Sequence, residues 1–187
     1  MAVGKPPIKK EWYEILAPEE FGSTVIGETY AGPTPEAAIG RKAFVSAAAI
    51  TRQAAKQGYL LIFKIYKAEN KKLLSKVFEY KMLFSALKKL IKKGRSKIDL
   101  SFIVHTKDNK KIRVKPIIQT KFRTSRAIRA EIQANCIDII KNLASKLESQ
   151  KLFYNCAFGL LQKEVKGQLN KIFPIALFEF RWVKSDD

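Results

Sequence analysis

Short runs of apolar and β-branched residues, separated by glycines and prolines, mark the first third of the chain. Runs of this kind are typical of strands that are joined by turns. The sequence therefore predicts strands over residues 12–16, 24–30, 41–49 and 59–66. The last of these is the clearest, because it is rich in β-branched and aromatic side chains.

The periodicity of the apolar residues changes beyond residue 80. Leucines recur at helical spacing and predict a helix over residues 80–93, which ends at Gly94. Apolar and polar residues then alternate strictly, as they do in a strand with one buried face. This alternation predicts a long hairpin, with its first strand, turn and second strand at residues 98–105, 107–110 and 112–118.

The last third of the chain reads as helical. Thr124 or Ser125 can cap a long helix with one apolar stripe. The stripe consists of Ile128, Ile132, Cys136, Ile139, Leu143 and Leu147. Two further helices are predicted over residues 151–158 and 160–173, and a final strand over residues 176–183.

These elements predict an α+β fold with strands first, one helix inserted among them, and helices before a closing strand. We expect a flexible basic arm at residues 1–11 and a single domain at residues 12–187. Within that domain, the expected β-rich part, helical part and final strand cover residues 12–121, 122–174 and 176–183.

The charge of the chain indicates an anionic partner. Lys and Arg number 36 against 17 Asp and Glu, which gives a formal net charge of +19. Positive charges at this density repel one another in the folded state, and a polyanion relieves that repulsion. Nucleic acid is the first candidate and an anionic membrane surface the second, with the basic helix over residues 80–93 as its binding element.

The sequence contains no motif for catalysis, a cofactor or a metal. Cys136 and Cys156 lack zinc-ligand spacing and read as buried thiols that a cytosol keeps reduced, although a disulfide between them stays open. His105 is the one histidine and lies on a predicted strand. We expect no secretory signal, because the first residues lack an apolar stretch, and no membrane span, because no run is long and apolar enough. We therefore expect a cytoplasmic protein that is not an enzyme and does not bind a membrane.

A dense basic stretch is the strongest functional signal. Only Asp99 and Asp108 interrupt the positive charges between residues 88 and 129. The candidate RNA-binding residues are Lys88, Lys89, Lys92, Lys93, Arg95, Lys97, Lys107, Lys110, Lys111, Arg113, Lys115, Lys121, Arg123, Arg126 and Arg129, with Lys9 and Lys10 in the arm. Arginine binds phosphate in a bidentate manner, so we expect recognition of the RNA backbone and shape; the alternative is a solvated face.

The aromatic pair after Lys10 permits two interpretations. Trp12 and Tyr13 can stack on unpaired bases or pack into the core of the first strands. The sequence favours packing into the core.

Several segments, in consistent order, resemble one family of ribosomal proteins. They read KKEWYEILAP at residues 9–18, IGET at 26–29, GR before FVS at 40–46, KID at 97–99, TKD at 106–108, RVK at 113–115, IFPI at 172–175 and FRWVK at 180–184. This set resembles the S-three-A-e family of archaeal and eukaryotic small-subunit proteins, which is distinct from the bacterial repeated-domain protein. The chain departs from that family at residues 78–81, and it is similar to a short, archaeal-like version.

The resemblance implies a structural constituent of the small ribosomal subunit and a barrel-like, mostly antiparallel sheet. It implies a place on the platform near the messenger RNA exit. The implied partners are small-subunit ribosomal RNA, neighbouring ribosomal proteins and the messenger RNA itself. The alternative is a non-ribosomal RNA-binding protein or RNA chaperone.

Overall fold

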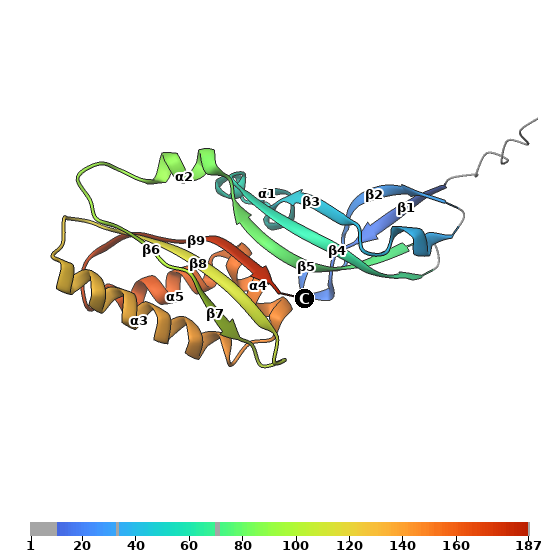
Figure 1. Ribbon diagram of the computed structural model, residues 1–187. Helices are drawn as coiled ribbons and strands as arrows, with labels where there is room; N and C mark the ends of the chain where they lie inside the picture. Colours follow the sequence, from blue (N-terminus) through green and yellow to red (C-terminus); the bar gives the residue numbers. More distant parts are fainter. Residues whose placement is uncertain (1–10, 33, 70–71, 187) are drawn as a thin grey trace, which may run out of the picture.

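The computed structural model describes residues 11–32, 34–69 and 72–186 (Figure 1). Residues 1–10 of the expected basic arm, including Lys9 and Lys10, lie outside the described residues. Glu11, which the sequence assigned to the arm, is the first residue of strand β1 (Glu11–Leu16).

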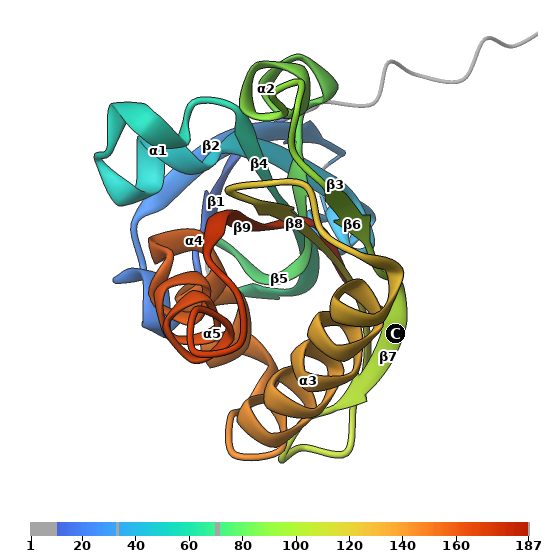
Figure 2. The same ribbon diagram turned by 90° about the vertical axis from the view of Figure 1, so that its left-hand side faces the viewer.

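In the described residues, the strands form one mixed sheet of nine strands. The remaining strands are β2 (Val25–Ala31), β3 (Lys42–Ser46), β4 (Tyr59–Glu69), β5 (Lys72–Met82), β6 (Lys97–Asp99), β7 (Phe102–His105), β8 (Lys111–Thr120) and β9 (Ile175–Ser185). Neighbouring strands are antiparallel apart from the parallel pair β1–β5. The sheet curves without closing into a barrel (Figure 2).

Strand β9 joins the two halves of the sheet. It pairs with β5 from the N-terminal half and with β8 from the hairpin. The predicted closing strand is therefore confirmed, and it gives the sheet its continuity. As a result, side chains from β4, β5, β8 and β9 share one curved surface.

Three helices near the C-terminus pack together on one side of β8 and β9 (Figures 1 and 2). These are α3 (Arg126–Ala144), α4 (Ser149–Phe158) and α5 (Leu160–Leu169). Two shorter helices, α1 (Ala47–Thr51) and α2 (Phe84–Leu90), lie among the strands. Short 3-10 turns occur at η1 (Glu19–Phe21), η2 (Pro35–Ala38) and η3 (Ala54–Lys56).

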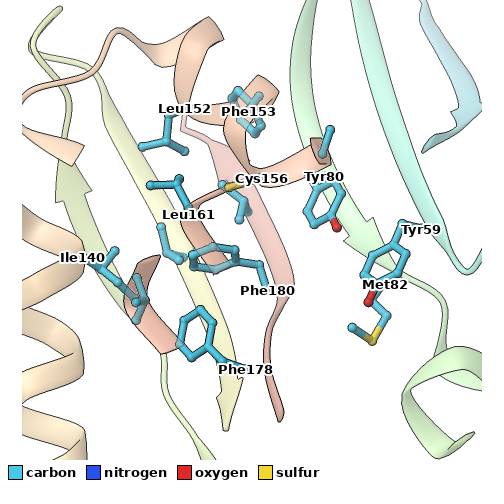
Figure 3. Packing of buried hydrophobic residues seen from close by; sticks show 14 of the residues in the cluster. Tyr59, Tyr80, Met82, Ile140, Leu152, Phe153, Cys156, Leu161, Phe178 and Phe180 are labelled. Atoms are coloured by element: carbon cyan, nitrogen blue, oxygen red, sulfur yellow. The ribbon is translucent and has the colours of Figure 1, made fainter. Parts of the chain in front are cut away.

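Helix α3 and its neighbours enclose the main core (Figure 3). The predicted stripe is confirmed in part, because Ile132 and Cys136 are buried while Ile139 and Leu143 lie at the margin of the core. Ile140 joins the buried positions, since residues four apart lie on one helix face. A second, smaller cluster lies under the N-terminal strands.

The helix predicted over residues 80–93 is wrong at its start. Residues up to Met82 belong to β5, and the helix covers only Phe84–Leu90. Phe78 explains the error, because it is the extra residue of a bulge where β5 pairs with β4. A bulge breaks the alternation of buried and exposed residues by which a strand is recognised in the sequence.

Two other predicted elements end earlier than expected. The strand over residues 41–49 stops at Ser46, where α1 begins. Helix α5 stops at Leu169 and not at residue 173, and the Asn170 side chain accepts a 2.8 Å hydrogen bond from the Ile175 amide. That bond competes with continued helix, as asparagine side chains often do at helix ends.

Candidate nucleic-acid interface

The first basic cluster of the candidate site surrounds α2. Lys88 and Lys89 lie in its last turn, where cations interact favourably with the helix dipole. The following loop carries Lys92, Lys93 and Arg95, all exposed to solvent. The loop is held down by Gln119, whose side-chain amide donates to the Lys92 carbonyl at 2.9 Å. These side chains therefore project from an anchored backbone.

A groove between β6 and α3, which we call the α3 groove, brings three candidate residues together. Lys97, Arg126 and Arg129 line a hollow of about 290 Å³. Lys97 also forms an ion pair with Asp99 at 2.7 Å, and both side chains are partly exposed. The spacing of the two arginines predicted that they would share a helix face, and the structure adds Lys97 from a strand to that face.

The start of α3 is held in place beside this groove. Ser125 is the N-cap, and its hydroxyl accepts a 3.4 Å hydrogen bond from the Ile128 amide. The amide of Thr124 donates to the hydroxyl of Ser96 at 3.0 Å, which ties the helix entry to the loop before β6. The N-terminal turn, with its free amides and two arginines, is suited to a phosphate group. Lys121 and Arg123 are exposed in the segment just before it.

The hairpin carries the remaining candidates. Lys107, Lys110 and Lys111 lie at or beside its tip. In β8, Arg113 and Lys115 alternate with buried Ile112 and Val114. The two cations therefore point away from the core, as predicted, and belong to the strand surface and not to the α3 groove.

The open side of the sheet contains cations that the sequence analysis missed. Cross-strand pairing places Lys184 between Glu79 and Arg113, and Trp182 between Lys81 and Lys115. On the other side of β5, Lys64 pairs with both Lys42 and Lys76. We call this surface the open face, and it comprises Lys42, Lys64, Tyr66, Lys76, Phe78, Glu79, Lys81, Arg113, Lys115, Arg181, Trp182 and Lys184. Basic residues placed among apolar ones in β4 and β9 were its sequence signal.

The two adjacent aromatic residues of β1 point to opposite sides of the strand. Tyr13 is 3% exposed and packs in the smaller core cluster, as expected. Trp12 is 64% exposed and lies against Tyr30 with ring centroids 5.2 Å apart, so the prediction that Trp12 packs into the core is wrong. Neighbouring residues of a strand cannot both face the core.

Buried titratable groups lie away from these surfaces. Cys136 and Cys156 are free buried thiols and form no disulfide. Burial raises the pKa of Cys136 to about 12 and raises that of Cys156 as well. Burial also raises the pKa of Glu179, against the opposing effects of Lys56 and of hydrogen bonds with Gln162 and Tyr59. None of these three residues lines the α3 groove or belongs to the open face.

Within the described residues, no group of three or more histidine, cysteine, aspartate and glutamate side chains is placed to hold a metal ion. Over the same part of the chain, none of the helices combines the length and the apolar character needed to cross a membrane.

Comparisons with known proteins point to one family. The family model described as the ribosomal S3Ae family matches residues 4–185. The small ribosomal subunit protein eS1 of Nanoarchaeum equitans is 34% identical over 177 residues, which cover 92% of this chain and 87% of that protein. The protein of the same name from Methanocaldococcus jannaschii is 31% identical over 89% of this chain and 75% of its own length. The one from Haloarcula marismortui is 24% identical over 96% and 84%.

Proposed function

The chain belongs to the ribosomal S3Ae family, and from that premise we propose that it is a structural component of the small ribosomal subunit that binds ribosomal RNA. It does so mainly through the phosphate backbone and the shape of the RNA. The relatives carry the name of a small-subunit protein, and the net charge of +19 gives the chain the electrostatics of a polyanion-binding protein.

The groove between β6 and α3 is the observation that carries this proposal. Arg126, Arg129 and Lys97 line it at the N-terminus of a 19-residue helix whose cap is formed by Ser125. Guanidinium groups bind phosphate through paired hydrogen bonds, and helix N-terminal amides add to the attraction. A phosphate of folded RNA that enters this groove meets three cations, of which only Lys97 has a carboxylate partner there.

The resemblance of the sequence motifs supports a proposal for the position in the subunit. We propose that the protein sits on the platform near the messenger RNA exit, next to other ribosomal proteins and within reach of messenger RNA, as part of cytoplasmic ribosomes. Exposed apolar side chains that include Phe44 at 66% and Phe122 at 65% offer contacts for such neighbours. A structural and not a catalytic contribution fits the family.

Charge reversal in the groove tests the proposed function. Arg126→Glu with Arg129→Glu should reduce incorporation of the tagged protein into small subunits, measured by its distribution on sucrose gradients. Lys141→Glu with Lys146→Glu is the matched control, because both lysines are exposed near the other end of α3 and change the net charge equally. Equal incorporation of the two variants contradicts the groove as an RNA contact.

The same gradient distinguishes the alternative function. A non-ribosomal RNA-binding protein or RNA chaperone stays in the light fractions whether or not the groove is intact. Wild-type protein that never comigrates with small subunits therefore contradicts the ribosomal proposal as a whole.

A further inference from the structure

We propose that the open face binds an unpaired segment of RNA, with bases stacked on Phe78 and Trp182 and phosphates bound by the surrounding lysines. This inference rests on the proposed RNA-binding function and assigns a second, chemically different contact to it. The α3 groove offers charge alone, whereas the open face combines charge with aromatic rings.

Lysines gather closely around the aromatic rings of this face. The ammonium groups of Lys42, Lys64 and Lys184 lie 4.7, 5.6 and 5.5 Å from the centre of the Phe78 ring. Lys184 also lies 5.8 Å from the Trp182 ring, and Lys115 lies 4.2 Å from it. The rings and cations therefore form one continuous chain of contacts across β3, β4, β5, β9 and β8.

Irregular strand pairing creates this arrangement. Phe78 is the extra residue of the β4–β5 bulge, and Tyr66 occupies the same position in a second bulge of that pair, with Lys76 4.3 Å from its ring. A third bulge, between β8 and β9, leaves Arg181 without a cross-strand partner beside Trp182. In a regular strand, side chains alternate between the core and the open side. Each bulge here interrupts that alternation and adds an aromatic or basic side chain to the open face.

A pocket beside Trp182 provides room for a base. Its volume is about 380 Å³, and its lining includes Trp182, Met82, Phe84, Lys81 and Arg181. This volume falls within the range of roughly 300–1,000 Å³ that is usual for ligand pockets. Apolar walls with cations at the margin suit a planar base joined to a phosphate.

A carboxylate on the neighbouring strand fixes the orientation of the Trp182 ring. The indole Nε1 of Trp182 donates a hydrogen bond to Oε1 of Glu79 on the neighbouring strand β5. Glu79 is the only carboxylate of the open face and is engaged in this bond. It therefore positions the ring and leaves the charge of the face strongly positive.

Within the described residues, no cation of the open face takes part in an ion pair. The ion pairs of Lys67, Lys97 and Lys151 lie elsewhere in the described part of the chain. The lysines instead lie over aromatic rings, a weak contact at exposed positions. Charge-assisted hydrogen bonds to phosphate are stronger, so RNA phosphates would draw the ammonium groups aside and expose the rings to bases.

Unpaired RNA fits this face better than a duplex or an acidic protein segment. The bases of an A-form helix are stacked inside it and cannot reach an aromatic ring on a sheet. An acidic peptide would neutralise the lysines but would leave the rings and the pocket without planar partners. Aromatic rings that alternate with cations are the usual platform for single-stranded nucleic acid.

Fluorescence of Trp182 gives a direct test. The chain has two tryptophans, so Trp12→Phe in the full-length protein leaves Trp182 as the reporter. Titration with a twelve-nucleotide adenine or uracil RNA should quench its emission at concentrations that saturate binding. A polyglutamate peptide of equal charge should bind more weakly and leave the emission unchanged. Absence of quenching by RNA, or equal quenching by polyglutamate, overturns the proposal.

Charge-matched variants test the lysines. Lys42→Gln, Lys64→Gln and Lys184→Gln together should reduce the affinity for the RNA oligonucleotide at least tenfold. They should also make the log–log salt slope shallower by roughly 2, since each single-strand phosphate contact contributes about 0.7. The control is Lys141→Gln, Lys146→Gln and Lys163→Gln, which removes equal charge from exposed positions in or beside the helices. Equal effects of the two triple variants would reduce the face to non-specific charge and contradict the proposal.

Phe78→Leu separates stacking from charge and keeps an apolar side chain at the bulge. It should lower the affinity for the oligonucleotide about tenfold at unchanged salt slope, with the melting temperature reported alongside as a check of folding. If the open-face variants bind the oligonucleotide normally while the α3 groove variant still fails to enter subunits, this inference is wrong and the proposed function stands. If the groove variant also assembles normally, the proposed groove contact fails as well.

Discussion

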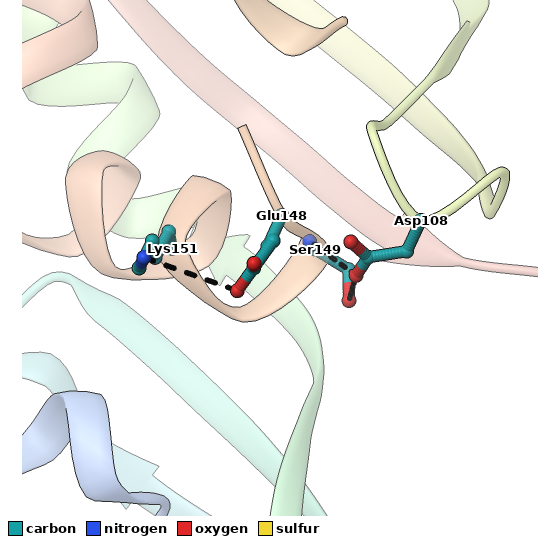
Figure 4. Close-up of polar contacts among 4 residues, drawn as sticks. All are labelled: Asp108, Glu148, Ser149 and Lys151. Carbon is teal, nitrogen blue, oxygen red and sulfur yellow. Dashed lines mark hydrogen bonds and ion pairs between the residues drawn. The ribbon is translucent and has the colours of Figure 1, made fainter. Parts of the chain in front are cut away.

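Asp108, at the tip of the β7–β8 hairpin, caps the first turn of α4 by accepting two hydrogen bonds from Ser149 (Figure 4). Its Oδ2 atom accepts from the backbone amide and from the hydroxyl of Ser149, each at 3.1 Å. Next to it, the Lys107 amide donates to the Leu147 carbonyl at 3.0 Å. The basic hairpin tip is therefore fastened to the helical layer and presents its lysines from a fixed position.

Asp108→Ala should lower the free energy of unfolding by about 1–2 kcal/mol, because it leaves a helix N-terminal amide and a buried hydroxyl without an acceptor. Chemical denaturation followed by circular dichroism measures the loss. Lys151→Ala is the control. Its ion pair with Glu148 is long, at 3.9 Å, and exposed, so its removal should change stability by no more than about 0.5 kcal/mol. Equal losses in both variants would contradict the capping interpretation.

Gly58 permits the close approach of α2 to the start of β4. A Cβ atom at this position would lie 2.4 Å from the Cβ of Ala86. The Leu83 amide also donates to the Gly58 carbonyl at 2.8 Å, which fixes the two segments against each other. The backbone therefore cannot move away without losing that bond.

Gly58→Ala should destabilise the protein by about 1–3 kcal/mol through overpacking against Ala86. Gly167→Ala offers the opposite case within α5, since an added Cβ meets no heavy atom within 4 Å there. It should stabilise the helix by up to about 1 kcal/mol. Thermal melts of both variants, and of Gly58→Ala combined with Ala86→Gly, check the argument. A double variant no more stable than Gly58→Ala alone would refute the contact as the cause.

The sequence predicted the fold well where one period runs without interruption. Helix α3 has such a period, and its buried positions Ile132 and Cys136 were identified correctly. Strand β5 has none, because the bulge at Phe78 shifts the alternation and Tyr80 then resembles the start of a helix. Pairing with neighbouring strands stabilises β5, and these neighbours cannot be identified from the local sequence.

The candidate site likewise has one part that was predictable from local sequence and one part that was not. Arg126 and Arg129 are close in sequence, so their common face was predictable from helical spacing. Lys42 and Lys184 are brought to one ring by the order of the strands, which no local pattern specifies. The open face was therefore missed, although each of its residues was visible in the sequence.

The two cysteines provide a prediction on reactivity. Both thiols are buried, and burial holds the pKa of Cys136 at about 12 and raises that of Cys156. The thiolate is the reactive form, so native protein at pH 8 should react with a thiol reagent such as Ellman's reagent only as fast as it unfolds. Two thiols per chain should react at once in denaturant. Rapid labelling of the native protein would contradict the burial of these residues.

Glu179 occupies an environment that disfavours its charge. It lies on β9 next to the packed residues Phe178 and Phe180, and its Oε2 atom accepts a 3.4 Å hydrogen bond from the side-chain amide of Gln162. Burial raises the pKa of Glu179 above its ordinary value of 4.5, while the opposing influence of Lys56 is smaller. The same carboxylate raises the pKa of Tyr59, for which burial is the larger cause.

The stability of the protein should therefore fall with rising pH across the interval that begins near 4.5 and ends at the raised pKa of folded Glu179. In that interval the unfolded carboxyl group loses its proton first, while the folded one retains it, so the folded state binds more protons. Glu179→Gln removes this dependence. The stability of the wild type relative to that variant should decrease from pH 4 to pH 8, as measured by urea denaturation at each pH. Glu164→Gln, on the exposed side of α5, controls for the change in net charge. A stability difference that stays constant, or that grows in favour of the wild type as pH rises, would show that Glu179 is not held in its neutral form by burial.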